Sequence, residues 1–211
     1  MNAELLQHFN QTLRDRQLLS HPFYRRWEDG ELRRDELTHY AEQYRHFEAM
    51  LPSFLGKLSD QLSDGFAKDY VTANLSDEVG PPSHLALFHS FAHFYNDGEA
   101  PMSPSTTSLL NAYHEVQRRG PVSALAGLLA YESRGAAIAD SKAAGLKGNY
   151  CASDEAVTFW IEHGSIEVDH AAWTFEALSS LEPSLDEVER AARLVGDAWS
   201  EFLNERELKN A

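Results

Sequence analysis

Two histidines and a glutamate at helical spacing are the residues of this sequence best suited to do chemistry. His163, Glu167 and His170 lie inside a long segment with helical periodicity. Successive residues of an α-helix turn by about 100°, so offsets of four and seven bring the three side chains within about 60° of one face. Two imidazoles and a carboxylate on one stripe make half of a transition-metal site.

Residues for a second half of such a site occur earlier in the chain. Glu132 lies in the middle of another helix-like stretch, and Glu78 and His84 flank a break at Gly80-Pro81-Pro82. Three carboxylates and three imidazoles suit a two-metal centre inside a helical bundle. A mixed Glu/His set favours iron or manganese, with O2 and a reductant as co-substrates, whereas a structural zinc site would favour cysteines. A hydrolytic two-metal site stays open on ligand type alone.

The alternative for the histidine stripe is a solvated helix face with ordinary polar residues. Phe159, Trp160 and Leu178 argue against it, since they place much of this helix in a core. A carboxylate such as Glu132, if it faces the core, is costly to bury unless it is paired or bound to metal.

Two further histidines also have ligand spacing. His89 and His93 are four residues apart, but Phe88, Phe91 and Phe94 surround them and favour a packing role. Spacing alone separates these two from His84 only weakly. The remaining histidines carry no pattern: His8, His21, His39, His46 and His114.

Composition excludes several classes of partner. The formal charge of -15, from 33 acidic residues against 18 Lys and Arg, disfavours nucleic acid and anionic membranes. No apolar run reaches the roughly 20 residues that span a bilayer, and the N-terminus lacks the features of a signal peptide. The single Cys151 fits a reducing cytoplasm and is a poor nucleophile candidate.

Every long segment has helical period, which predicts an all-α fold. We expect one domain over residues 1–211, built as a bundle of about seven or eight helices. The ranges expected to be helical are 3–19, 35–60, 66–78, 84–95, 105–118, 121–145, 154–179 and 184–206.

Local signals refine these helices. Asp35 is the expected N-cap of the helix over 35–60, and Pro52 is a potential kink. Loops are expected at His21-Pro22, Gly80-Pro81-Pro82, Asn96-Asp97-Gly98 and Gly148-Asn149. The segment from Gly120 to Gly145 is rich in Gly and Ala, so this helix either approaches its neighbours closely or leaves a cavity beside it.

Several of these residues together resemble a known family. The motifs are His21-Pro22-Phe23-Tyr24, Asn74-Leu75-Ser76-Asp77-Glu78, Tyr131-Glu132-Ser133 and the stripe from His163 to His170. The chain resembles the heme-oxygenase-like di-metal oxidases of the TenA/PqqC superfamily, and within it the CADD-like p-aminobenzoate synthases. The likeness covers most of the chain and implies a heme-oxygenase-like bundle and a homodimer.

The resemblance also implies roles for individual residues. It places the metal ligands at Glu78, His84, Glu132, His163, Glu167 and His170, with an Fe/Fe or Fe/Mn pair. It implies that the enzyme consumes itself in making p-aminobenzoate for folate biosynthesis: Tyr24 supplies the ring, Lys142 the nitrogen, and Tyr131 assists. There is then no need for an external small-molecule substrate.

Two departures from the family pattern bear on the metals. The stretch from Glu78 to His84 looks one residue shorter than in the chlamydial member of the CADD-like family. Glu167 stands where that chlamydial protein has Asp. For Tyr24 and Tyr131 the alternative role is core packing, and for Lys142 it is a solvated surface position.

Three other functions remain open. The first is a di-iron oxygenase acting on an external fatty acid or amine, with Tyr24 intact. The second is a TenA/PqqC-like metal-free enzyme, which would leave the six ligands unexplained. The third is a non-enzymatic binding module whose polar cluster is structural.

Overall fold

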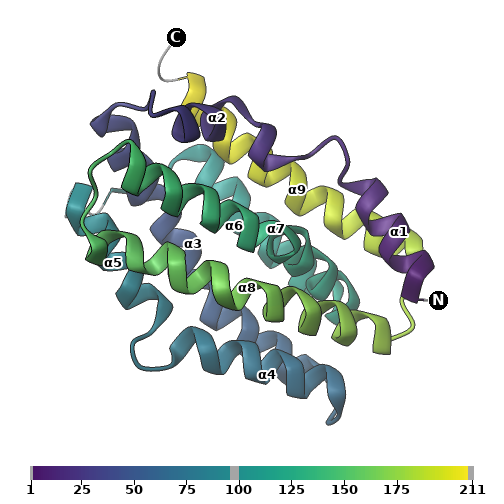
Figure 1. Ribbon diagram of the computed structural model, residues 1–211. Coiled ribbons are helices and arrows are strands. Elements are labelled where there is room, and N and C mark those ends of the chain that lie inside the picture. Colours follow the sequence, from purple (N-terminus) through teal and green to yellow (C-terminus); the bar gives the residue numbers. More distant parts are fainter. Residues whose placement is uncertain (1, 96–99, 209–211) are drawn as a thin grey trace.

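The computed structural model describes residues 2–95 and 100–208, and in this part of the chain there is no strand (Figure 1). The all-α prediction is confirmed. The elements are α1 (Asn2–Thr12), a short 3-10 helix η1 (Leu18–Ser20), α2 (Pro22–Asp29), α3 (Arg34–Gln61), α4 (Phe66–Val79), α5 (His84–Tyr95), α6 (Pro104–Arg119), α7 (Pro121–Gly148), α8 (Asp154–Ser180) and α9 (Leu185–Leu208). The loop predicted at Asn96-Asp97-Gly98 lies outside the described residues.

The N-terminal prediction was wrong in one respect. The helix expected over 3–19 ends at Thr12, and the loop expected at His21-Pro22 is instead the start of α2. Pro22 occupies the first turn, where its missing N–H costs nothing, and His21 Nδ1 accepts a hydrogen bond of 3.2 Å from the Phe23 N–H. The described residues therefore form one more α-helix than the eight ranges expected. The additional helix is α2, which carries Tyr24.

Other helix boundaries were predicted closely. The break at Gly80-Pro81-Pro82 separates α4 from α5, and α7 ends at Gly148. The N-cap of α3 is Arg33 rather than Asp35, because the Glu36 carboxylate accepts the Arg33 N–H at 2.9 Å. The helix continues through Pro52 to its end at Gln61.

Helix α7 lies at the centre of the bundle and packs mainly against α8 and α9. Close approach depends on its small residues, as expected from the sequence. A Cβ at Gly145 would lie 2.7 Å from Trp27 Cδ1, and one at Gly164 of α8 would lie 2.9 Å from Asp140 Oδ1. Around this core, α1 lies along α9 and α4 lies along α8 (Figure 1).

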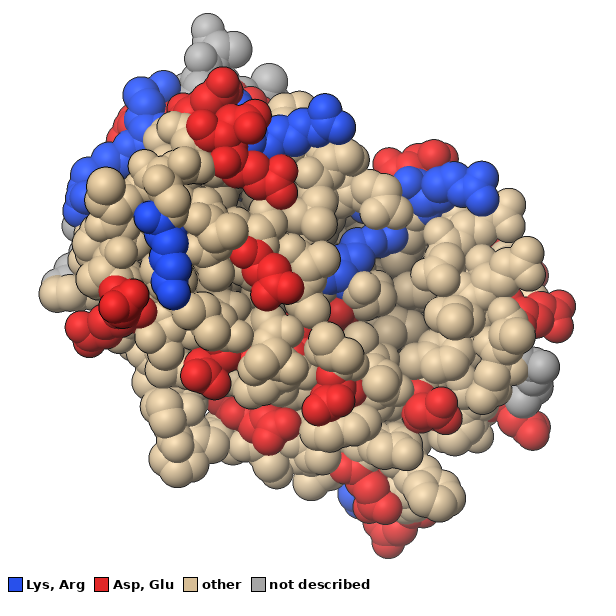
Figure 2. Space-filling view, in the orientation of Figure 1, with Lys and Arg blue, Asp and Glu red and all other residues tan. Residues whose placement is uncertain are grey.

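The chain has a formal charge of -15. Asp and Glu side chains are scattered over the face drawn in Figure 2. In the described part of the chain, no helix combines the length and the apolar character that crossing a membrane requires.

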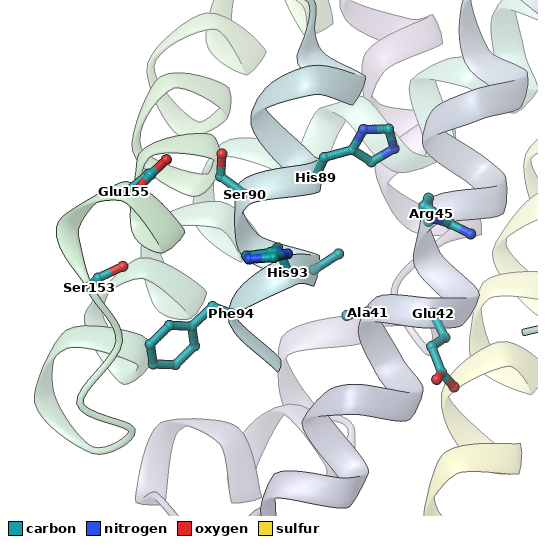
Figure 3. A pocket seen from close by; sticks show the side chains of 10 residues that line it. Ala41, Glu42, Arg45, His89, Ser90, His93, Phe94, Ser153 and Glu155 are labelled. Atoms are coloured by element: carbon teal, nitrogen blue, oxygen red, sulfur yellow. The ribbon is translucent and has the colours of Figure 1, made fainter. Parts of the chain in front are cut away.

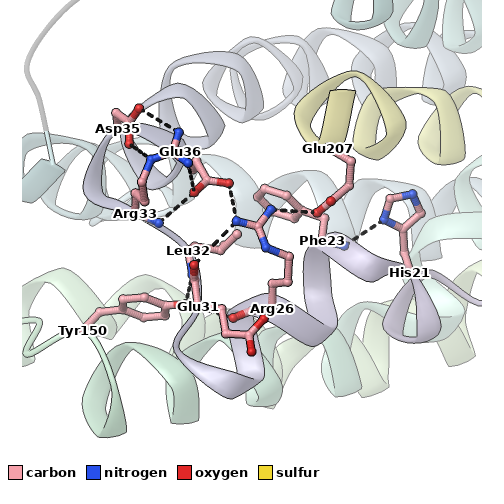
Figure 4. A network of polar contacts seen from close by, with 10 residues as sticks. All are labelled: His21, Phe23, Arg26, Glu31, Leu32, Arg33, Asp35, Glu36, Tyr150 and Glu207. Atoms are coloured by element: carbon pink, nitrogen blue, oxygen red, sulfur yellow. Dashed lines mark hydrogen bonds and ion pairs between the residues drawn. The ribbon is translucent and has the colours of Figure 1, made fainter. Parts of the chain in front are cut away.

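Helix α2 is fixed to the bundle by polar contacts (Figure 4). The Arg26 guanidinium donates to Glu36 Oε1 of α3 at 2.7 Å and to Glu207 Oε1 of α9 at 3.1 Å. Tyr150 donates its hydroxyl to the Arg26 carbonyl at 3.2 Å and accepts the Leu32 N–H at the same distance. These bonds join α2, an eight-residue helix that would be marginal alone, to α3, to α9 and to the loop that carries Tyr150.

Replacing Arg26 with Ala is therefore expected to destabilise the protein. It leaves the buried Glu36 carboxylate short of one partner, and we expect a loss of about 1–3 kcal/mol in the free energy of unfolding. Chemical denaturation measures this loss. The control is Arg25→Ala, an exposed neighbour, which should change stability by less than about 0.5 kcal/mol; equal losses for the two variants would contradict the role given to Arg26.

Candidate active site

The six predicted metal ligands come together inside the bundle, and all are buried. Glu78 Oε1 at the end of α4 lies 3.0 Å from His84 Nδ1 at the start of α5. On α8, His163 Nε2 lies 3.0 Å from Glu167 Oε1, and His170 Nδ1 lies 3.8 Å from the same oxygen. The His84 ring centroid is 5.5 Å from that of His163, which joins the two groups.

The donor atoms of this cluster are short of partners. Each of the six side chains has at least one buried nitrogen or oxygen without a hydrogen bond, and some close pairs lack hydrogen-bonding geometry. The atoms concerned are Glu78 Oε1, His84 Nδ1, Glu132 Oε2, His163 Nδ1 and Nε2, Glu167 Oε2 and His170 Nδ1. Unsatisfied buried polar atoms are costly and rare in folded proteins, so their concentration here fits a site for cations.

The side chains are not arranged as a finished coordination shell. Among the described residues, no group of three or more His, Cys, Asp or Glu side chains is positioned to hold one ion as it stands. Side-chain rotations would be needed to complete a coordination shell. They are possible because the donor atoms concerned have no hydrogen bonds to break. The residue types, the burial and the missing partners fit a pair of divalent ions.

Burial keeps much of the cluster in its neutral form. It raises the pKa of Glu132 to about 7 and, with the charge of Glu78, raises that of Glu167 well above its ordinary value. Burial, followed by the neighbouring His84 and His170, lowers the pKa of His163 well below its usual range. Metal ligands must be deprotonated, so binding of cations here would release protons from the carboxyl groups.

Gly135 of α7 leaves room for the Glu167 side chain. A Cβ at Gly135 of α7 would lie 2.2 Å from Glu167 Oε2 and 2.7 Å from its Cδ. The carboxylate of α8 therefore rests against bare backbone of α7, three residues after Glu132. Any larger residue at this position would occupy the space of the predicted ligand.

Three supporting side chains were not assigned roles from the sequence. Asn74 Nδ2 donates to Glu132 Oε1 at 2.7 Å, and the nearby Thr174 side chain lowers the pKa of this carboxylate against the larger effect of burial. Asp77 Oδ2 lies 3.3 Å from His170 Nε2, so the Nδ1 atom of that ring is left facing Glu167. Such outer contacts orient metal ligands and fix histidine tautomers. Asn74 and Thr174 are four residues from Glu78 and His170 respectively, a spacing that could have revealed them.

Beside the ligand cluster lies a group of buried phenols around one lysine. The Tyr24 hydroxyl is 3.2 Å from that of Tyr40, and Lys142 Nζ donates to the Tyr40 hydroxyl. The same lysine nitrogen lies 5.0 Å from the Tyr24 ring centroid and 3.9 Å from the Trp160 ring centroid. Three of these residues are far apart in sequence, on α2, α3 and α7, and the fold brings them together.

The third predicted residue, Tyr131, joins this group from the other side. Its hydroxyl is hydrogen-bonded to that of Tyr44, whose ring stacks on Tyr40 with centroids 5.4 Å apart. Tyr131 also stacks on Trp199 at 4.6 Å. Neither Tyr40 nor Tyr44 was assigned a role from the sequence.

Burial sets the protonation of these groups. It raises the pKa of Tyr24 and of Tyr40 well above the ordinary value of a phenol, so both remain protonated. It lowers the pKa of Lys142 well below that of a surface lysine. Lys142 is therefore not a solvated surface residue, and its surroundings favour the neutral amine over the ammonium form.

His89 and His93 lie outside this site. With Glu42 and Arg45 of α3 they line a surface pocket of about 450 Å³ between α3, α5 and the start of α8 (Figure 3). None of the six predicted ligands lines it. A different cleft, at the α4–α5 break, does reach the ligand His84 and is bordered by Asp77 and Glu162.

The chain matches known proteins over most of its length. The family model of iron-containing redox enzymes matches residues 38–201. The 4-aminobenzoate synthase of Nitrosomonas europaea is 30% identical, with 94% of this chain and 89% of that protein covered. The 4-aminobenzoate synthase of Chlamydia muridarum is 24% identical, with 97% and 90% covered.

Solved structures agree on the fold. A TenA homologue from Pseudomonas syringae superposes with a TM-score of 0.79 at 13% identity, covering 97% of this chain and 93% of that one. A CADD-like protein of unknown function from Nostoc punctiforme gives a TM-score of 0.77 at 16% identity, covering 99% and 97%. The buried carboxylate and imidazole cluster, the heme-oxygenase-like helical fold and the family match agree: this chain belongs to the iron-containing redox enzymes.

Proposed function

We propose that this protein is an oxygen-dependent 4-aminobenzoate synthase that uses its own Tyr24 as ring source and Lys142 as nitrogen source. The observation that carries the proposal is the burial of a protonated phenol and a neutral lysine amine together, with Lys142 Nζ 5.0 Å from the Tyr24 ring centroid. The relatives from Nitrosomonas europaea and Chlamydia muridarum, named 4-aminobenzoate synthase, support the reaction.

The metal centre would be held by the six clustered side chains. Glu78, His84 and Glu132 reach it from α4, α5 and α7, and the histidine stripe of α8 supplies the other three. Their mixture of carboxylates and imidazoles suits two iron ions or an iron–manganese pair. When bound there in reduced form, such metals supply activation of O2 and the oxidising power for the reaction.

The carbon balance of the reaction fits Tyr24. Its ring and Cβ contain all the carbon atoms of 4-aminobenzoate. Release breaks the Cα–Cβ bond and leaves a glycine residue at position 24, while Cβ is oxidised to the carboxylate. The two carboxylate oxygens come from O2. The phenol oxygen leaves as water when the ring carbon bonds to Lys142 Nζ. Two-electron oxidation and hydrolysis of the Cε–Nζ bond then free the amino group and leave an aldehyde at Cε of residue 142. O2 is the oxidant, and an external reductant supplies the remaining electrons.

The side chains around Tyr24 and Lys142 position these two residues and keep water away from them. Tyr40 contacts both, since its hydroxyl bonds the Tyr24 hydroxyl and receives a hydrogen bond from Lys142. Trp27 donates its indole N–H to the Lys142 carbonyl at 3.3 Å, which joins α2 to α7 at the reacting residues. The aromatic walls exclude water, which keeps the amine neutral. Tyr44 stacks on Tyr40 and is hydrogen-bonded to Tyr131, which precedes the predicted ligand Glu132 in the chain, so these two phenols can relay an electron and a proton.

Mass spectrometry of the Tyr24 and Lys142 peptides tests the proposal. Protein loaded with Fe(II), with and without Mn(II), is compared before and after O2 and reductant. We expect glycine in place of tyrosine at position 24, in an amount equal to the 4-aminobenzoate released. The proposal fails if Tyr24→Phe or Lys142→Arg protein still gives full yield. An intact Tyr24 alongside metal-dependent O2 uptake would instead indicate an external fatty acid or amine substrate.

A further inference from the structure

One buried carboxylate of the site has no role in the function proposed so far. Glu48, on α3, is 1% exposed. Neither of its side-chain oxygens has a hydrogen-bond partner, and among the described residues no ion pair with it is found. Tyr44, one helical turn earlier, interacts with it but lacks good hydrogen-bonding geometry. A carboxyl group without partners in a core is costly whether charged or neutral.

The groups that act on Glu48 belong to the metal cluster. Its main electrostatic neighbours are Glu78, His84 and Glu167. Burial first, and then the Glu78 carboxylate, raises the pKa of Glu48 to about 8. Two basic side chains are affected by Glu48: Lys142, whose own burial lowers its pKa, and His84, which is itself one of the predicted metal ligands. Among the described residues, no hydrogen bond or ion pair therefore compensates a charge on this carboxylate.

A comparison with Glu36 shows how unusual this is. Glu36 lies on the same helix and is also buried, but its oxygens accept bonds from Arg26 and from the Arg33 backbone. The structure therefore provides hydrogen-bond partners for Glu36 and none for Glu48. The missing partner of Glu48 must come from what the site binds, if its burial is to be stable.

Charge counting supports a cation as that partner. Two divalent ions carry four positive charges, and the predicted ligands Glu78, Glu132 and Glu167 supply three negative ones. A fourth carboxylate makes the buried centre neutral, which lowers the cost of burying the ions. Hard cations such as Fe(II) and Mn(II) also accept an additional oxygen donor readily.

We propose that Glu48 is a fourth carboxylate ligand of the metal centre and that it reaches the centre from α3, a helix that otherwise contributes no ligand. This assignment rests on the metal centre of the proposed function. It does not depend on which molecule is the substrate.

Metal binding by Glu48→Gln protein tests the assignment. Metal-free protein is titrated with Mn(II), and free Mn(II) is followed by electron paramagnetic resonance, so the readout is independent of catalysis. We expect the wild type to bind two ions, and the variant to lose about 10- to 100-fold or more in affinity for at least one of them. Glu48→Asp, which keeps the charge on a shorter side chain, should lie between the two.

The matched control is Glu36→Gln. It should lower the melting temperature of the metal-free protein and leave Mn(II) affinity unchanged, whereas Glu48→Gln should weaken Mn(II) binding without lowering that melting temperature. A Glu48→Gln protein that binds two ions with wild-type affinity would overturn the assignment. So would a wild type that binds none, which would also end the proposed function. If the wild type binds two ions but releases no 4-aminobenzoate, the proposed function is wrong and the assignment of Glu48 is not affected.

Discussion

Lys142→Met protein should release no 4-aminobenzoate and yet be more stable than the wild type. The variant removes the amine that would supply the nitrogen. It also removes a fully buried amine that has aromatic neighbours and no carboxylate partner in hydrogen-bonding contact. A buried lysine must give up its proton on folding, which costs free energy at neutral pH, so replacing it by an apolar side chain of similar length should stabilise the protein by about 1–4 kcal/mol. Product analysis and denaturant unfolding measure the two effects.

The gain in stability should depend on pH in a defined direction. Burial lowers the pKa of Lys142 in the folded protein, so the unfolded chain binds the proton more tightly. The resulting penalty on the wild type is greatest below the folded pKa and disappears as the pH rises to the unfolded value of about 10.4. The difference in unfolding free energy between the variant and the wild type should therefore shrink as the pH is raised toward that value.

The control for this prediction is Lys147→Met, on the same helix but exposed. It should leave both product yield and the pH dependence of stability at wild-type values. If Lys142→Met destabilises the protein and the stability difference does not change with pH, Lys142 is charged and paired in the folded state, and its role as a neutral amine is wrong.

Gly135→Ala is expected to disable the metal centre through a single methyl group. The added Cβ would lie 2.2 Å from Glu167 Oε2, so the carboxylate must move away from its place between α7 and α8. We expect metal affinity to fall by about 10- to 100-fold, as it does when the supports of a ligand are lost. Overpacking should cost about 1–3 kcal/mol of stability, offset by up to about 1 kcal/mol from the better helix propensity of alanine.

Gly148→Ala is the matched control for this substitution. It lies at the end of the same helix, and a Cβ there meets nothing within 4 Å. Its metal affinity, measured by Mn(II) titration, should equal that of the wild type. Wild-type metal binding by Gly135→Ala protein would mean that Glu167 is not a ligand or that α7 and α8 separate easily.

The histidine stripe shows what local sequence can determine. His163, Glu167 and His170 share one helix, so their common face follows from helical geometry alone, and all three are buried in the structure. The all-α class follows in the same way from the repeat of apolar residues. The resemblance to the family then supplied Tyr24, Tyr131 and Lys142, which spacing could not single out.

Helix α2 shows why a short element escaped prediction. It has eight residues, too few to show a reliable apolar period, and its stability comes from partners on other helices. Arg26 bonds Glu36 and Glu207, the second of which is far away in the chain. The sequence around His21-Pro22 signals a turn equally well, and only the packed bundle decides in favour of a helix.

By itself, the sequence determined the helical class and the shared face of the α8 ligands, because both follow from contacts within a few residues. The tertiary structure alone decided which isolated polar residues face that stripe. Glu48, Tyr40 and Lys142 lie on two helices whose orientation depends on long-range packing, and each could equally have pointed to solvent by local rules. Burial in the core, the property on which the roles proposed for Glu48 and Lys142 depend, exists only once those helices are packed together.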